Sequence, residues 1–257
     1  MARCESLDPP PHLRISLNPK CKQFEKQVGR RLLIHGPTLQ DLFTQYEKIG
    51  ITLMSKLTFP TPNSSVTTTD EEIQPGRKVR IYTPVKYEGG KPACVFYHGG
   101  GWAMGDLNGE DPQIRKICRD AGVVIVSVDY RLAPQHRYPV PLDDCVAAYE
   151  WVLNNHQQLR TLPGKVFTFG TSAGANLALS TALKIIDAGK GDTLVGVVAV
   201  TPVTVIPSAV PEKWRKNYTS YEQHAENTVN TKSAMEIFIG RCSSLKLIIA
   251  MADDWCF

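Results

Sequence analysis

The sequence predicts an α/β protein with a doubly wound, mostly parallel sheet and helices on both faces. Short apolar runs typical of buried parallel strands recur along the middle of the chain, and stretches with helical spacing separate them. A glycine-rich motif follows one of these runs directly, and a serine motif follows another. Alternating strands and helices form right-handed crossovers, so ligand sites are expected beyond the carboxyl ends of the strands.

Length and composition fit one α/β domain over residues 1–257. The chain is 42% hydrophobic and 21% charged, which allows it to bury a full core. The net charge is +4 and the basic residues are scattered, so we expect no nucleic-acid partner. No run has the length of a transmembrane segment or the pattern of a signal peptide, which favours a cytoplasmic protein.

The seven cysteines are an odd number without a CxxC pair. Several lie in apolar patterns typical of small buried side chains. This usage favours a reducing compartment and predicts neither a metal site nor another cofactor.

An arm and cap helices are predicted for residues 1–58. Residues 1 to about 20 are rich in proline, and residues 39–56 carry apolar side chains at helical spacing. Residues 60–69 are rich in proline, serine and threonine, which is typical of a loop. The first predicted strand, Val79–Pro84, alternates in polarity and ends at a proline.

The core sheet is expected within residues 65–205. Buried strands are predicted at residues 92–97, 122–129, 166–170 and 194–202. Helices are predicted at residues 111–121, at 142–158 and directly after Ser172. Residues 206–240 are polar and cap-like, with a short helix near 233–239, and residues 241–257 form an atypical C-terminus.

Ser172 lies in the motif Gly170-Thr171-Ser172-Ala173-Gly174, between a predicted strand and a predicted helix. The two glycines remove side chains where such a turn brings backbone segments together, and the helix N-terminus favours developing negative charge. We therefore interpret Ser172 as a nucleophile. A serine that only caps the helix is the alternative.

The motif His98-Gly99-Gly100-Gly101 follows the predicted strand at 92–97. Consecutive glycines leave backbone N–H groups accessible, as required for binding the oxyanion of a tetrahedral intermediate. A dinucleotide-binding loop is the alternative, because glycines spaced as far as Gly105 also follow a strand. Trp102 is bulky where a pyrophosphate would approach, and Asp129 lacks the expected ribose-binding context, so an oxyanion loop is favoured.

These motifs resemble those of the hormone-sensitive-lipase-like branch of the α/β-hydrolase superfamily. The resemblance extends over about residues 60–205 and includes, in the family's order, His98-Gly99-Gly100-Gly101-Trp102, Asp129-Tyr130-Arg131-Leu132-Ala133-Pro134, Tyr138-Pro139-x-Pro141 with Asp143-Asp144, and Gly170-Thr171-Ser172-Ala173-Gly174. It implies an α/β-hydrolase fold with a helical cap and an esterase acting on small acyl esters.

The resemblance also implies a site with Ser172 as the nucleophile. The oxyanion hole would consist of the backbone amides of Gly99, Gly100 and Ala173. The other motif residues would be structural rather than catalytic: His98, Gly101, Gly170 and Gly174. Thr171 stands where many members have aspartate, which is expected to alter how the nucleophile turn is tied to its neighbours.

A histidine must accept the serine proton and an acid must orient that histidine; in this superfamily both follow the serine. Residues 245–251 resemble the late strand that carries the acid, so Asp253 or Asp254 matches its position, with an ordinary polar residue as the alternative. Among the histidines, which are His12, His35, His98, His136, His156 and His224, only the last follows Ser172, in sequence that resembles the cap. We therefore expect a C-terminally truncated member without the last strand, the last helix and the triad histidine.

Two functions from different classes follow. The first is a serine carboxylic-ester hydrolase, impaired by the missing histidine. The alternative is a catalytically inactive protein that binds a small ester or carboxylic acid in the same pocket, and a non-functional truncation product is a third possibility. The sequence predicts no oligomeric state.

Overall fold

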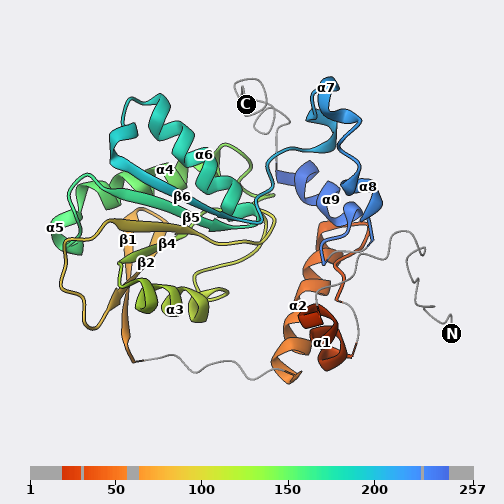
Figure 1. Ribbon diagram of the computed structural model, residues 1–257, viewed down its shortest axis with the longest axis horizontal. Helices are drawn as coiled ribbons and strands as arrows, with labels where there is room; N and C mark the ends of the chain where they lie inside the picture. Colours follow the sequence, from red (N-terminus) through yellow and green to blue (C-terminus); the bar gives the residue numbers. More distant parts are fainter. Residues whose placement is uncertain (1–18, 30–31, 57–63, 227–228, 243–257) are drawn as a thin grey trace. The chain divides into compact units, whose positions relative to one another are not determined.

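The structure, a computed structural model, describes residues 19–29, 32–56, 64–226 and 229–242 (Figure 1). The chain divides into two compact units, one formed by Pro60–Ala209 and Phe238–Phe257, the other by Met1–Phe59 and Val210–Ile237. The first unit contains the sheet. A single domain over residues 1–257 stays a prediction, because compactness alone does not say whether the units fold separately.

The sheet has six strands in the order β1-β2-β4-β3-β5-β6. Their bounds are β1 Val66–Gln74, β2 Arg77–Pro84, β3 Ala93–Tyr97, β4 Ile125–Asp129, β5 Val166–Thr171 and β6 Leu194–Val200. Strand β3 is parallel to β4 and β5, and β5 is parallel to β6, whereas β2 pairs antiparallel with β1 and β4. The predicted mostly parallel, doubly wound sheet is confirmed.

Helices cover both faces of this sheet, as predicted. Helix α3 (Asp111–Ala121) lies on one face, and α4 (Val140–Asn154) and α6 (Ala173–Asp187) lie on the other (Figure 1). Short helices complete the unit: α5 (His156–Leu159), η2 (Gly191–Thr193) and η3 (Pro207–Ala209). Helix α4 tolerates Pro141 because the N–H groups of a first turn have no partner within the helix.

Strand β1 shows that the loop predicted for residues 60–69 is wrong over residues 66–69, whereas residues 60–63 lie outside the described part of the chain. Its sequence, VTTTDEEIQ, is rich in β-branched residues, but only Val66 is fully buried. Since β1 is an edge strand, both of its faces can carry polar side chains, and the apolar alternation used to predict strands is absent.

Strand β6 is less buried than predicted. The side chains of Val195, Val198 and Val200 are each about half exposed, at 46%, 46% and 45%. In the described part of the chain β6 is the last strand of the sheet, so no further strand covers its outer edge. The apolar run predicted the strand correctly but not its position at the edge.

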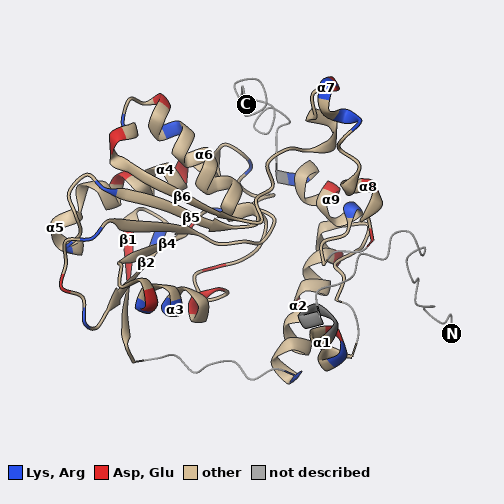
Figure 2. Cartoon of the chain, in the orientation of Figure 1, with Lys and Arg blue, Asp and Glu red and all other residues tan. Residues whose placement is uncertain are grey.

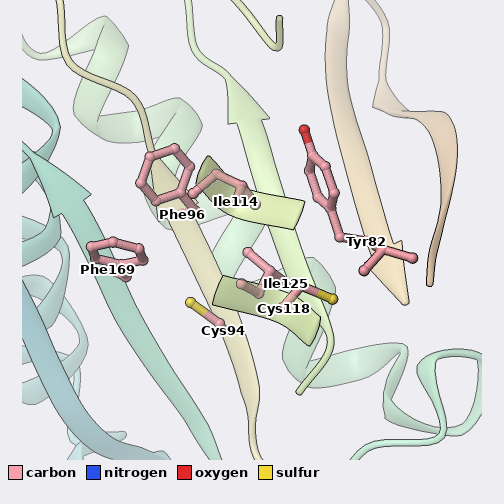
Figure 3. Close-up of a cluster of buried hydrophobic side chains, with 8 residues drawn as sticks. Tyr82, Cys94, Phe96, Ile114, Cys118, Ile125 and Phe169 are labelled. Carbon is pink, nitrogen blue, oxygen red and sulfur yellow. The ribbon is translucent and has the colours of Figure 1, made fainter. Parts of the chain in front are cut away.

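A cluster of buried side chains fills the space between the sheet and α3 (Figure 3). Its members are Val66, Tyr82, Cys94, Phe96, Ile114, Cys118, Ile125 and Phe169. The rings of Phe96 and Phe169 are 4.9 Å apart, which joins β3 to β5 within the core. Burial raises the pKa of the Cys118 thiol to about 12 and that of Cys94 well above its usual value, so both act as small apolar side chains, as predicted.

The second unit is mainly helical. Its helices are α1 (Pro19–Val28), α2 (Leu39–Lys56), α7 (Glu212–Arg215) and α8 (Ser220–Gln223), together with most of α9 (Lys232–Cys242). Ile34 donates its N–H to Val229 O at 2.6 Å and accepts the Thr231 hydroxyl at 2.8 Å. These bonds join the two sequence segments assigned to a cap, and their role as a cap stays a prediction.

Charged residues of both signs are interspersed over the helices and strands rather than gathered by sign (Figure 2). Among the helices that the structure describes, none combines the length and the apolar character that a bilayer crossing requires.

Asp144 is a buried carboxylate that holds the chain segment after β4. It is 1% exposed and accepts hydrogen bonds from the Arg131 N–H at 3.0 Å and from its Nε and Nη2 at 2.8 Å each. The Nε of Arg77 lies 3.0 Å from the same carboxylate. In this segment the Ala133 N–H donates to Trp102 O at 2.9 Å. Because Asp144 holds the same segment through Arg131, it also helps to hold Trp102, the residue that follows the glycine motif.

We expect Asp144→Ala to lower the free energy of unfolding by about 2–3 kcal/mol, because it leaves a backbone N–H and two guanidinium groups without their buried acceptor. Urea unfolding followed by circular dichroism measures the change. The exposed neighbour Asp143 is the matched control, and its alanine variant is expected to change stability by less than about 0.5 kcal/mol. Equal losses of unfolding free energy in both variants would contradict the role of Asp144 as a buried acceptor.

Candidate active site

Ser172 occupies a tight turn between β5 and α6. Its φ is +52° and its ψ is −116°, a conformation that costs a residue with a side chain about 1–3 kcal/mol. Backbone bonds hold it there: its N–H donates to Val200 O of β6 at 2.9 Å, and its carbonyl accepts the N–H groups of Ala175 and Asn176 at 3.1 and 3.2 Å. The neighbouring strand and the helix thus hold Ser172 in the strained turn.

Gly170 and Gly174 allow this turn to lie against the end of β3. A Cβ atom on Gly174 would come within 2.0 Å of Tyr97 O and 2.4 Å of His98 O. A Cβ on Gly170 would come within 2.1 Å of Gly174 O. Backbone therefore packs directly on backbone here, and the start of α6 lies next to the residue that begins the glycine motif.

The glycine motif forms a loop that closes on itself after β3. The N–H groups of Ala103 and Met104 donate to Gly100 O at 3.1 and 3.0 Å. Gly100 has a φ of +126°, and a Cβ on it would come within 2.0 Å of Met104 O. Helix α3 begins only at Asp111. A dinucleotide loop leads straight into a helix whose N-terminus binds the pyrophosphate, so that alternative does not fit.

His98 is buried beneath this loop, with 2% of its surface exposed. Its ring stacks on Tyr130 at 4.2 Å, and the Tyr130 hydroxyl donates to His98 O at 2.8 Å. Its Nδ1 lies 2.7 Å from Gly99 O; because a carbonyl only accepts, Nδ1 carries the proton. Burial lowers the pKa of His98, so the ring is neutral near pH 7. These contacts support the loop rather than activate a serine.

The predicted oxyanion donors differ in what they contact. The Gly99 N–H donates to Glu110 Oε1 at 2.9 Å, so this amide is engaged and does not fit the predicted role. Within the described residues the amides of Gly100 and Ala173 make no hydrogen bond. The peptide between Gly99 and Gly100 is planar and trans, so the Gly100 N–H points opposite to the Gly99 carbonyl, which His98 binds.

Glu110 also binds the turn that carries Ser172. The Thr171 hydroxyl donates to Glu110 Oε1 at 2.7 Å and to Oε2 at 3.0 Å. Thr171, which stands where many members of the resembled family have aspartate, is therefore bound to its neighbours as a hydrogen-bond donor to a carboxylate. Glu110 lies in no motif of the sequence, and no local pattern indicates it.

A proton acceptor for Ser172 is not found in the part of the chain that the structure describes. The Ser172 Oγ makes no hydrogen bond there, to any of the five described histidines or to another group. Asp253 and Asp254 lie outside the described residues. The site thus combines a strained serine, two amides without partners and a helix N-terminus, a set of groups suited to stabilising negative charge on a substrate oxygen.

Comparisons with known proteins agree with this architecture. A family model of the α/β-hydrolase fold matches residues 94–246. A versiconal hemiacetal acetate esterase of Aspergillus parasiticus is 40% identical over 216 residues, which cover 84% of this chain and 67% of that protein. The carboxylesterase NlhH of Mycobacterium tuberculosis is 35% identical over 161 residues, which cover 63% of this chain and 48% of that protein.

Solved structures of other proteins are similar to this chain in fold as well as in sequence. A hyperthermophilic esterase from the archaeon Pyrobaculum calidifontis superimposes with a TM-score of 0.69 at 30% identity, covering 89% of this chain and 71% of that one. The chain spans about two thirds or less of the length of the curated relatives named above. The relatives described above are named as esterases. Because the family model matches more than half of the residues, the chain belongs to the hormone-sensitive-lipase-like branch of the α/β-hydrolase family.

Proposed function

We propose that this chain is a serine carboxylic-ester hydrolase and that Ser172 is its nucleophile. The observation that carries the proposal is the backbone of Ser172, which is strained at a strand-to-helix turn, in a motif that begins and ends with a glycine. A serine that merely capped α6 would accept a hydrogen bond from the first turn, and the Ser172 side chain makes no such bond.

In the proposed reaction the Ser172 Oγ attacks the carbonyl carbon of an ester. The carbonyl oxygen becomes an oxyanion, which the N–H groups of Gly100 and Ala173 stabilise together with the N-terminus of α6. The alcohol leaves, the acyl group stays on Ser172, and water then releases the carboxylic acid. Each step needs a base to take the serine or water proton and to return a proton to the leaving group.

We propose acetate and other short acyl esters as substrates. A relative at 40% identity is named as an esterase of a hemiacetal acetate, and acetate is a short acyl group. The rate with p-nitrophenyl acetate is expected to exceed that with the octanoate ester. A preference for the octanoate would contradict this part of the proposal.

Hydrolysis of p-nitrophenyl acetate, compared between the chain and Ser172→Ala, tests the proposed reaction. Intact-mass measurement detects the acyl group on the protein, and digestion locates it on the peptide that contains Ser172. Release of nitrophenol at equal rates from both proteins would contradict a role for the serine.

The absence of a hydrogen bond between Ser172 and any described histidine favours a second candidate, an inactive binding protein. This alternative predicts saturable binding of a short carboxylic acid or ester without turnover. Thermal unfolding in the presence of acetate esters measures it. Turnover that depends on Ser172 would exclude the alternative, and the absence of any ligand-induced shift would count against it.

A further inference from the structure

We propose that Glu110 is a positioning residue of this site, whose carboxylate couples the glycine loop to the turn that carries Ser172. The inference rests on the proposed function, because it has Glu110 orient a backbone donor of the oxyanion hole of that reaction. Glu110 acts through the backbone of other residues and does not touch the substrate.

The carboxylate receives donors from both halves of the site. Its Oε1 accepts the Gly99 N–H at 2.9 Å and the Thr171 hydroxyl at 2.7 Å, and its Oε2 accepts the same hydroxyl at 3.0 Å. Gly99 follows β3 by two residues, and Thr171 is the last residue of β5. One side chain therefore links the two segments just beyond the point where Tyr97 and Gly170 end their pairing in the sheet.

This link determines the direction of a backbone donor. The Gly99 residue is held at its N–H by Glu110 and at its carbonyl by His98 Nδ1, 2.7 Å away. Since the following peptide is planar, these two contacts orient the Gly100 N–H. Glycine has a wide choice of backbone conformations, so without the anchors this loop would lose its single orientation.

Capping of helix α3 does not explain the position of the Glu110 carboxylate. Glu110 precedes the first residue of α3, but its side chain makes no hydrogen bond to the N–H groups of that helix. The space around Gly99 also favours the link, since a Cβ there would come within 3.2 Å of Glu110 Oε1 and 3.1 Å of Thr171 Oγ1. The absence of a side chain at Gly99 thus lets the carboxylate and the hydroxyl approach the backbone.

Hydrogen exchange of the Gly99 amide, measured by NMR, tests the link without reference to activity. Glu110→Ala is expected to accelerate this exchange at least tenfold, because the acceptor is lost. Glu110→Gln is expected to stay near the wild-type rate, because one amide oxygen in the place of Oε1 can accept both donors. Asp120→Ala, an exposed change at the far end of α3, is the matched control and leaves the exchange unchanged.

Kinetics with p-nitrophenyl acetate give a second readout. In Glu110→Ala the kcat is expected to fall roughly tenfold to a hundredfold with little change in KM, as when a transition-state donor is displaced by about 1 Å. Thr171→Val is expected to lower kcat in the same direction, and Thr171→Ser restores it. In the double variant Glu110→Ala with Thr171→Val, the fold decrease in kcat is expected to be smaller than the product of the two single decreases. The reason is that both changes remove the same contact, between the Thr171 hydroxyl and the Glu110 carboxylate.

Equal Gly99 exchange in the wild type and in Glu110→Ala overturns the proposal, and so does a Glu110→Gln variant as fast-exchanging as the alanine variant. If Glu110→Ala does not fold, Thr171→Val decides through its kcat, since an unchanged kcat in that variant also overturns the link. If no protein hydrolyses the ester, the proposed function fails by itself, and the exchange of Gly99 still decides the role of Glu110.

Discussion

Ser172→Ala is expected to lower ester hydrolysis to a small residual rate while leaving the fold intact. The hydroxyl is the proposed acceptor of the acyl group, and loss of such a nucleophile lowers kcat by about 10⁶ where a full triad operates. A residual acceleration of about 10³–10⁴ over water remains, from binding and the oxyanion donors. Stability should change little, because the Ser172 side chain makes no hydrogen bond in the described structure and alanine has the same backbone strain.

The measurement is nitrophenol release, with circular dichroism to establish the fold. Ser180, 3% exposed and two turns further along α6, is the matched control. Its alanine variant removes a hydroxyl from the same helix and is expected to keep the wild-type rate. Hydrolysis retained in Ser172→Ala but lost in Ser180→Ala would reverse the assignment.

Gly174→Ala is expected to lower the free energy of unfolding by about 3 kcal/mol or more and to remove activity with it. The new methyl group would lie 2.0 Å from Tyr97 O and 2.4 Å from His98 O, and both of these atoms are backbone. Backbone cannot rotate away as a flexible side chain can, so α6 must separate from β3. Alanine gains about 1 kcal/mol of helix propensity at this position, which is too little to offset the overlap.

Urea unfolding of Gly174→Ala and of Gly196→Ala separates this overlap from a general effect of glycine. Gly196 lies in β6, and a Cβ there would meet no atom within 4 Å. Its replacement is expected to be neutral or to stabilise the strand by about 0.5–1 kcal/mol. A Gly174→Ala variant as stable as the wild type would show that the turn can shift without cost.

The elements that the sequence predicted well are those whose burial is visible in their own residues. Strands β3, β4 and β5 are short apolar runs because both of their faces are covered, and the helices between them carry apolar residues on one side. Strand β1 was missed for the opposite reason, since its polar residues leave no alternation to detect. Strand β6 was found, but its exposure at the sheet edge depends on what lies beside it, which an apolar run does not record.

Within the candidate site the sequence alone determined the serine turn and the glycine loop, because strain and close backbone approach require glycines at local, regular spacing. Only the tertiary structure decided which amides are available. Gly99 lies 11 residues before Glu110, and Thr171 lies 61 residues after it. A single carboxylate binds one predicted donor and orients the next, and no local pattern indicates it. One of its partners follows β3 and the other ends β5, and these segments meet only when the sheet has formed.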